Sequence, residues 1–344
     1  MDTTHEPELH DPVDLCDPSG RRLDPAAMGW SRQPLHRANL RGARWRTKKW
    51  DYWAVLAGDL AIGLVYADVG YVGLATMWWG ELDTGHTGGR DLVRPLSRGI
   101  TLPDVPGSAP LRVDDDRLSM RLSDDEAGTS LSVRWTDSAD SSPGELDVLV
   151  ERPPGHESLS VVIPWGESRF QFTTKDQARP ARGVLRRGDR EDRIGDDGDA
   201  WGVLDVGRGR WPYSIRWNWG GGAGRAGTGE VVGVQFGARW TEGTGFTENA
   251  ITIDGRLLKL GRELEWSYDW DHPMRPWRVR DAEGALDLTL TPRHDCHSLT
   301  NAVALRMEVH QVFGTWSGTV RAADGTVLQL DGIQGFAEEA RNRW

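Results

Sequence analysis

Short runs of β-forming residues, separated about every ten residues by glycine, aspartate or proline, constrain the fold of this chain most strongly. Such spacing leaves little room for long helices and suits the turns and bulges of antiparallel sheets. The segment 50–79 is the clearest example, because apolar runs at 50–57, 60–67 and 71–79 alternate with turn-forming residues. We predict a β-meander there and an all-β fold class for the chain.

The same pattern continues through both halves of the sequence and fits barrels or sandwiches. Further predicted strands are 130–135, 145–151, 158–163, 169–174, 231–239, 250–254, 256–260, 263–270, 286–290 and 302–312. Segments 318–322 and 326–330 flank an Ala-Asp-Gly turn, which predicts a hairpin. The end of the chain, 335–344, predicts a short C-terminal helix. Closing a sheet into a barrel removes its edges and can leave room for one small ligand.

The chain has 344 residues, enough for two domains, and its composition suggests where they begin. Residues 1–40 are rich in proline, aspartate and arginine and predict an extended leader across the fold. We expect an N-terminal barrel at 41–190 and a C-terminal barrel at 191–344. The polar stretch 186–199 predicts a solvated loop between the halves.

Charge and composition narrow the functional classes. The net charge of −11 argues against nucleic-acid binding and disfavours anionic membrane surfaces. Asp59 and Asp68 lie in the most apolar segment and disfavour a membrane-spanning helix there. The N-terminus lacks the apolar core of a signal peptide, and two cysteines make no disulfide framework. We therefore expect a reduced, cytoplasmic protein, and the sequence leaves its oligomeric state open.

The 18 tryptophans supply large buried areas, and the densest aromatic cluster lies at 211–219. On a strand, Trp217 and Trp219 share one face, while Arg216 and Asn218 share the other. Indole faces stabilise cations and also suit polyenes, terpenoids and sugar rings. The cluster predicts a ligand pocket, and the alternative is a solidly packed aromatic core. The candidate ligand-binding residues are Arg208, Trp211, Tyr213, Arg216, Trp217, Asn218, Trp219 and Asn249.

Two carboxylates are candidate catalytic residues. Asp205 precedes the aromatic cluster and can act as a general acid if it is buried there. The alternative is a turn aspartate, or a partner of Arg208. Glu248 lies with Asn249 between a glycine-rich turn and an apolar strand. The alternative to a pocket role for this pair is a structural hydrogen-bond network.

His310 is the third candidate catalytic residue. It shares one face of the predicted strand 302–312 with Arg306 and Glu308, while Met307 lies on the other face. If the charged face lines a barrel, Glu308 and His310 form an acid–base pair. The alternative is a solvent-facing charged stripe.

We predict no metal site and no cofactor. The segment 294–297 reads His-Asp-Cys-His, but no second ligand pair stands at a recognised spacing. The glycines at 220–222 lack the Lys-Ser/Thr of a phosphate-binding loop and a following helix. No Gly-x-Ser-x-Gly nucleophile elbow occurs.

Several long blocks occur in a fixed order along the chain. They are LDPAAMGWSRQPLH at 23–36, KKWDYW at 48–53, YADVGYVGLA at 66–75, RGRWPYSIRWNWGGG at 208–222, GFTENAITIDGRLLKLG at 245–261, and QVFGTWSGTV and GFAEEARNRW within 311–344. Together these blocks resemble the bacterial family called domain of unknown function 2804. The resemblance spans nearly the whole chain. That family is uncharacterised, so it implies no activity directly.

The pattern is more distantly similar to tandem lipocalin-like proteins, which include carotenoid 1,2-hydratases and fungal Diels–Alderase-type cyclases. The segment 199–205, followed by Trp211, looks like the hydratases' central Ala-Trp-hydrophobic-Asp segment. Here the spacing to the later tryptophan is longer and the usual flanking acid is absent. The resemblance implies two tandem lipocalin-like, calycin-type antiparallel barrels with a pocket near their junction.

Three functions fit these observations. The first is an enzyme that acts on an apolar or isoprenoid-like substrate by proton transfer, as a hydratase, isomerase or cyclase. The second is a non-catalytic carrier of a lipophilic ligand. The third is carbohydrate binding or glycoside hydrolysis, since tryptophan stacks on sugars and paired carboxylates cleave them. We predict binding of a small apolar molecule and leave open whether the protein is an enzyme.

Overall fold

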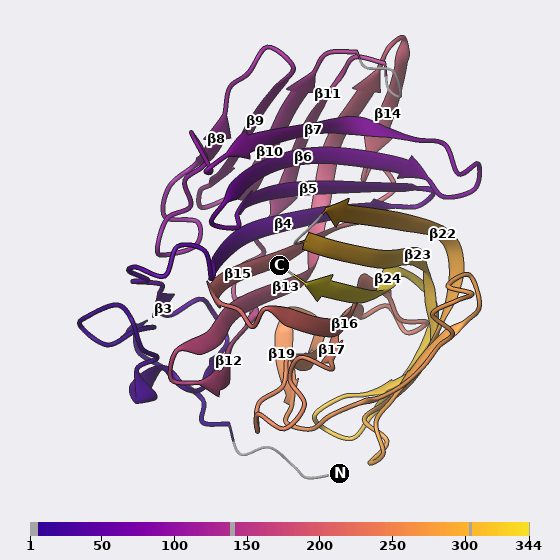
Figure 1. Cartoon of the computed structure of the whole chain (residues 1–344). Helices are drawn as coiled ribbons and strands as arrows, with labels where there is room; N and C mark the ends of the chain where they lie inside the picture. The colour runs from indigo at the N-terminus through magenta and orange to yellow at the C-terminus, as the bar shows by residue number, and fades with distance from the viewer. Residues whose placement is uncertain (1–5, 138–141, 303–304, 344) are drawn as a thin grey trace.

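The structure is a computed structural model that describes residues 6–137, 142–302 and 305–343. Two large antiparallel sheets, each curled on itself, make up most of the molecule (Figure 1). The 3-10 helix η1 (Pro25–Ala27) is the one helical element among the described residues. A helix long and apolar enough to cross a membrane is absent from this part of the chain. The all-β antiparallel fold class predicted from the sequence is therefore confirmed.

The first sheet has 13 strands and contains the predicted β-meander. Its main path is β7 (Thr87–Pro95), β6 (Val72–Glu81), β5 (Leu60–Asp68), β4 (Thr47–Ala57), β15 (Ala200–Arg210), β13 (Arg169–Arg187), β11 (Gly144–Glu151), β10 (Gly128–Trp135), β9 (Leu118–Asp124) and β8 (Leu111–Val113). Off this path, β12 (Leu159–Gly166) and β14 (Arg190–Ile194) pair with β13, and β2 (Trp30–Ser31) pairs with β12.

The second sheet has nine strands and lies beside β4 and β15 of the first (Figure 1). Its order is β19 (Arg256–Leu260), β18 (Asn249–Ile253), β17 (Val231–Ala238), β16 (Ser214–Arg225), β24 (Val327–Arg343), β23 (Leu305–Arg321), β22 (Leu286–Ala302), β21 (Trp277–Arg280) and β20 (Glu265–Ser267). The predicted hairpin is confirmed, since β23 and β24 pair across the turn at 322–326.

Alternation of apolar and polar residues gives each sheet its own core. In β9, Leu118, Met120 and Leu122 are buried, whereas Ser119 and Arg121 between them are exposed. Successive side chains of a strand point to opposite faces, so this pattern turns one face inward and the other to solvent. The described part of the leader, residues 6–40, adds the small parallel pair β1 (Val13–Asp14) and β3 (His36–Arg37) and packs over β12 and β13.

The predicted C-terminal helix is wrong. Residues 335–343 belong to β24, which lies between β16 and β23, while Trp344 lies outside the described residues. The sequence GFAEEAR favours a helix locally, but the sheet requires its small residues, because Gly335, Ala337 and Ala340 are packed against neighbouring strands. Tertiary packing thus overrides local propensity.

The predicted loop 186–199 is also wrong in its first half. Strand β13 continues to Arg187 and returns as β14, so this polar segment makes a hairpin whose charged side chains pair with each other. The first sheet therefore includes residues beyond 190, and β15 is its last strand along the chain. The chain then passes to the second sheet at 211–213. The domain bounds given above stay a prediction. Residues 303–304 of the predicted strand 302–312 lie outside the described residues.

Gly335 tests the close packing of β24. A Cβ atom at this position would lie 2.4 Å from Trp316 Cδ1 and 2.5 Å from the carbonyl oxygen of Gly221. We expect Gly335→Ala to lower the free energy of unfolding by about 2 kcal/mol, since overpacking forces the backbone to shift. Urea denaturation measures the change. Gly227→Ala is the control, because a Cβ there meets nothing within 4 Å, and an equal loss in both variants would contradict the packing argument.

Candidate functional site

A cavity of about 930 Å³ lies between the two sheets. Strands β4 to β7, β13 and β15 of the first sheet form part of its wall, and β16 and β22 to β24 of the second sheet form the rest. Its size is within the usual range for small-molecule pockets. The lining includes Gly63, Val65, Ala67, Leu74, Met77, Met307 and Val309 among apolar residues, and Thr173, Lys175, Asp205, Glu248, Gln311 and Glu338 among polar ones.

Six indole rings line this cavity, from Trp50, Trp78, Trp211, Trp217, Trp219 and Trp240. The ring of Trp211 is central, with centroids 5.4 Å from Trp50, 5.6 Å from Trp217 and 5.8 Å from Trp240, which stacks on it at 10°. The rings therefore pack against one another and still present surface to a cavity. The sequence-based prediction of a ligand pocket and its alternative, a packed aromatic core, each describe part of this arrangement.

A buried ion-pair network stands beside this aromatic wall. Lys175 Nζ lies 2.9 Å from Asp205 Oδ1 and 3.2 Å from Glu248 Oε2, and 4.3 Å from the centroid of the Trp219 ring. Burial works to lower the pKa of Lys175, but the two carboxylates raise it overall, so the ammonium group stays charged. Trp50 Nε1 and Thr173 Oγ1 also donate to Asp205, at 3.1 Å each.

Glu248 lies directly before β18 and is buried. Trp240 Nε1 donates to its Oε1 at 2.6 Å, while its Oε2 faces Lys175 without the alignment of a hydrogen bond. Burial raises the pKa of Glu248 to about 7, in spite of the neighbouring ammonium group. A carboxyl of this kind exchanges its proton near neutral pH, as a general acid or base requires.

Glu338 on β24 is a second buried glutamate that lines the cavity. Trp217 Nε1 donates to Oε1 of Glu338 at 2.7 Å. Among the described residues, this is the one hydrogen bond that the Glu338 carboxyl accepts. Burial raises the pKa of Glu338 to about 7. Tyr52 lies in the same wall, and its hydroxyl, with a pKa raised well above the usual value by burial, donates to Gln311 Oε1 at 3.0 Å.

The structure brings five of the candidate residues together at the cavity. They are Asp205, Glu248, Trp211, Trp217 and Trp219. The other six candidates are not among the lining residues: His310, Arg208, Tyr213, Arg216, Asn218 and Asn249. The alternation of side chains explains part of this division, because Trp217 and Trp219 face the cavity while Arg216 and Asn218 point to the other side of β16.

The candidates outside the cavity have other contacts. Arg208 is buried against Asp51, with Nη2 and Oδ1 2.6 Å apart, and not against Asp205. Asn249 accepts from Gly237 N at 2.8 Å and donates to the carbonyl oxygen of Arg262 at 2.9 Å. These bonds belong to the structural network that the sequence left as the alternative for Asn249.

The two β16 candidates outside the cavity also make contacts within the protein. Asn218 donates to the backbone oxygen of Glu338 at 3.1 Å, and Arg216 pairs with Glu339 at 2.8 Å. Tyr213 is 51% exposed and lies outside the cavity lining.

Sequence reasoning missed two of the central cavity residues. Lys175 directly follows the predicted strand 169–174. Extending that strand by one residue places Lys175 on the same face as Thr173, because side chains alternate along a strand. Glu338 was hidden by the helix predicted for 335–344, which gives its side chain no defined direction. In a strand, Glu338 lies beside Trp219 of β16, a register that no local pattern reveals.

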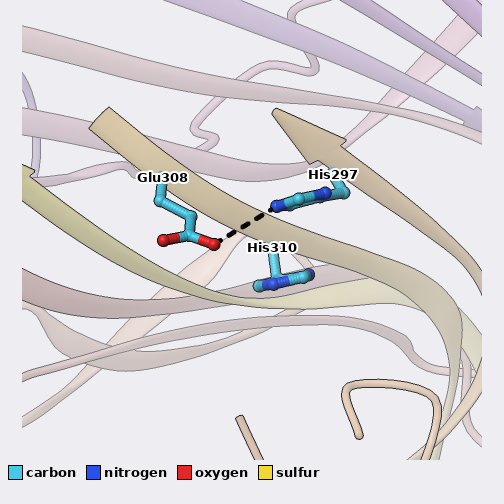
Figure 2. Close-up of side chains that lie close together, drawn as sticks. All are labelled: His297, Glu308 and His310. Carbon is cyan, nitrogen blue, oxygen red and sulfur yellow. Dashed lines mark ion pairs between the residues drawn. The ribbon is translucent and has the colours of Figure 1, made fainter. Parts of the chain in front are cut away.

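A separate group of side chains can hold a metal ion. The side chains of His297, Glu308 and His310 offer ligand atoms that all lie within 4.8 Å of one another (Figure 2). Glu308 and His310, the predicted acid–base pair, lie on the face of β23 opposite to Met307 and Val309, which line the cavity. His297 on β22 is itself a lining residue.

The raised pKa of Glu338 predicts a pH-dependent contribution to stability. Its pKa rises from 4.5 to about 7 on folding, so the folded state holds a proton that the unfolded state releases between these values. The free energy of unfolding therefore falls as the pH rises through this window, by roughly 3 kcal/mol for this group. In Glu338→Gln this loss is absent, so the variant gains stability relative to the wild type from pH 4.5 to pH 8 by about that amount.

Chemical denaturation at several pH values measures this difference. Glu126→Gln serves as the control, because that side chain is exposed on a turn and no such gain is expected from it. Parallel pH profiles for Glu338→Gln and the wild type would show that the Glu338 carboxyl is not perturbed in the folded state.

No curated protein shows a significant sequence match to this chain. Among solved structures, the chain is similar to kievitone hydratase from Nectria haematococca, at 12% identity over 89% of this chain and 93% of that chain, with a TM-score of 0.48. It is also similar to CghA, at 12% identity over 89% of this chain and 90% of that chain, with a TM-score of 0.43. The family described as "Domain of unknown function (DUF2804)" matches residues 6–344, which confirms the resemblance indicated by the sequence blocks, and this chain belongs to that family.

Proposed function

We propose that the protein binds a small, mainly apolar molecule in the cavity between its sheets and transfers a proton to it. The observation that carries this proposal is the pair of buried glutamates, Glu248 and Glu338, with pKa values raised to about 7 beside an indole-lined cavity. A neutral carboxylic acid facing an apolar ligand is the arrangement that acid catalysis on an alkene needs.

The walls of the cavity favour an apolar ligand. Six indole rings and the aliphatic side chains of β5 and β6 form much of the lining. The charged lining residues are Lys175, Asp205, Glu248 and Glu338, together with Arg90 and Asp91 of β7 and Arg117 directly before β9. Indole faces also stabilise positive charge through their quadrupoles, by roughly 0.5 to 2 kcal/mol each. An isoprenoid alkene that becomes a carbocation on protonation therefore fits both the shape and the electrostatics of this wall.

Glu338 is the acid that we assign to the reaction. Its carboxyl is fixed by one indole donor, whereas Glu248 lies 3.2 Å from the ammonium group of Lys175, which favours the ionised form. In a hydration, the Glu338 carboxyl gives its proton to one alkene carbon and the other carbon becomes cationic. Water adds to that carbon and returns a proton to the Glu338 carboxylate, so the sum is alkene plus water to alcohol.

The network around Asp205 speaks against a role for Asp205 in glycoside hydrolysis. Asp205 takes part in contacts with Lys175, Trp50 and Thr173, so its carboxylate is held as part of an ion pair. A glycosidase needs two carboxyls that flank the bond to be cleaved, one of them available as a base or nucleophile. A non-catalytic carrier uses the same cavity without the proton transfer, and the experiment below separates it from an enzyme.

We expect Val65→Trp to abolish binding of the neutral dye Nile red, because Val65 lines the cavity and the larger side chain fills it. Glu338→Gln keeps the dye-binding site but lacks the proton, so it loses conversion of any substrate by at least 100-fold. Dye fluorescence measures binding. Mass spectrometry of geraniol, farnesol and squalene after incubation with the protein detects the addition of water.

Val93→Trp is the control for bulk, since Val93 is 56% exposed on β7 and is not a lining residue. It should bind Nile red as the wild type does. Equal dye binding by the wild type and Val65→Trp would exclude the cavity as the ligand site. Binding of the isoprenoids without conversion by the wild type would identify a carrier, and conversion by Glu338→Gln at the wild-type rate would remove Glu338 from the mechanism.

A further inference from the structure

Two histidines and a glutamate meet on one face of the β22–β23 ladder. His297 and His310 are directly opposite each other in the register, and Glu308 lies two residues before His310 on the same strand and the same face (Figure 2). His297 Nε2 lies 3.6 Å from Glu308 Oε1, and the two imidazole rings stack with centroids 4.2 Å apart. The ladder therefore holds three potential ligands together without help from a loop.

The side chain of Asp295 orients His310 as a potential metal ligand. Asp295 Oδ2 lies 2.7 Å from His310 Nδ1, and Trp270 packs edge-on against the His310 ring at 4.6 Å. A carboxylate on Nδ1 fixes the tautomer with the proton on that nitrogen and leaves Nε2 to bind an ion. The other oxygen of Asp295, Oδ1, is buried with no hydrogen-bond partner among the described residues.

We propose that His297, Glu308 and His310 bind a divalent transition-metal ion, with Zn²⁺ as the ion whose ligand preferences fit best. Two imidazoles and one carboxylate, with an outer carboxylate on a histidine, are a common ligand set for such ions. The rings now stack nearly parallel, at 7°, so each turns on binding until both lone pairs point at the ion.

The surroundings of the cluster affect how the ion is bound. Arg306 Nη2 lies 3.0 Å from Glu308 Oε2, but this arginine is exposed and can move while Oε1 binds the ion. His297 also lines the cavity, whereas Glu308 and His310 lie on the face of β23 opposite to its lining residues. Three protein ligands leave a coordination position for water or for a ligand atom.

The test uses the whole protein with ZnCl₂ and CoCl₂ as probes. We expect one equivalent of Zn²⁺ in calorimetry and a cobalt absorption spectrum with nitrogen and oxygen ligands. His297→Ala and Glu308→Gln should each weaken binding at least tenfold, and Asp295→Asn by about tenfold or more through the outer shell.

His10→Ala is the matched control, because that histidine is exposed in the leader and is not part of this cluster, and its loss should leave the affinity unchanged. Circular dichroism confirms that each variant folds. If the wild type binds no Zn²⁺, or if the double variant His297→Ala/Glu308→Gln binds it as tightly as the wild type, the proposal is wrong.

A second, independent cluster consists of five arginines around a separate cavity of about 410 Å³. The residues are Arg21, Arg41, Arg46, Arg169 and Arg210, together with Ser168, Gly42 and Ala43. They come from the leader, the segment before β4, and the ends of β13 and β15. No acidic residue is among the lining residues.

Direct ion pairs do not neutralise this cluster in the part of the chain that the structure describes. The chain has a net charge of −11, yet no ion pair involves any of these five arginines among the described residues. Arg210 is buried and donates to the backbone oxygens of Gly20 and Arg41, at 2.7 Å and 2.6 Å, while its Nε has no hydrogen-bond partner in the described structure. Gathered guanidinium groups repel one another unless an anion lies between them.

We infer that this cavity binds a phosphate group, either free or on a small organic molecule. Guanidinium groups bind phosphate in a bidentate manner, and several arginines around one concave site are a typical phosphate environment. Ser168 supplies a hydroxyl group at the same cavity.

Calorimetry at low ionic strength with inorganic phosphate and with phenyl phosphate tests this inference. We expect saturable binding of at least one, and the tighter of the two identifies a free or an esterified phosphate. The double variant Arg46→Gln/Arg169→Gln should weaken it at least tenfold. Arg112→Gln/Arg121→Gln removes two exposed positive charges from β8 and β9 and should leave the affinity unchanged.

Equal weakening by both double variants would show a general charge effect and would contradict a site at this cavity. Absence of saturable binding of either probe to the wild type would also overturn the inference.

Discussion

The buried ion pairs of Lys175 are the interaction on which the arrangement of the two sheets depends. Lys175 and Asp205 come from neighbouring strands of the first sheet, and Glu248 lies directly before β18 of the second. Removing one member of such a network leaves an uncompensated buried charge, which costs about 3 to 5 kcal/mol. The sheets therefore have one favourable position relative to each other, and further bonds such as Tyr52 to Gln311 and Trp165 to Trp240 fit that position.

The same network explains why a cavity persists between the sheets. Ionised groups need polar neighbours, so the sheets cannot close over Lys175 with aliphatic side chains as they do within each core. Bulky indole rings fill the space around the charges. Because these rings are planar and rigid, they leave gaps that smaller side chains would close. Glu338 and Glu248 are desolvated by this packing, which is why their pKa values move toward neutrality. Structure and proposed chemistry thus have one physical origin.

The sequence predicted most of the strands, because the alternation of apolar and polar residues is a local signal. Predicting the cavity required knowing which strands meet, and that is not local. Trp217 and Trp219 were placed on one face by alternation alone, and they do line the cavity. Glu338 could not be placed, because its segment favours a helix until Gly335 and Ala337 are packed between β16 and β23. The sequence predicts a ligand-binding role for Arg208 from its place before the aromatic cluster, but the structure buries it against Asp51, more than 150 residues earlier in the chain, and no local pattern indicates that contact.

Strand β23 contributes side chains to both proposed sites. Met307, Val309 and Gln311 line the cavity, while Glu308 and His310 on its opposite face form the cluster with His297. Because the period of a strand is two residues, a shift of the β22–β23 register by one residue would exchange these faces and destroy both sites together. The 17-residue length of β22 and β23, together with the irregularity between Pro292 and His294, fixes that register. The irregularity between Pro292 and His294 thus helps to set which side chains of β22 and β23 face each proposed site.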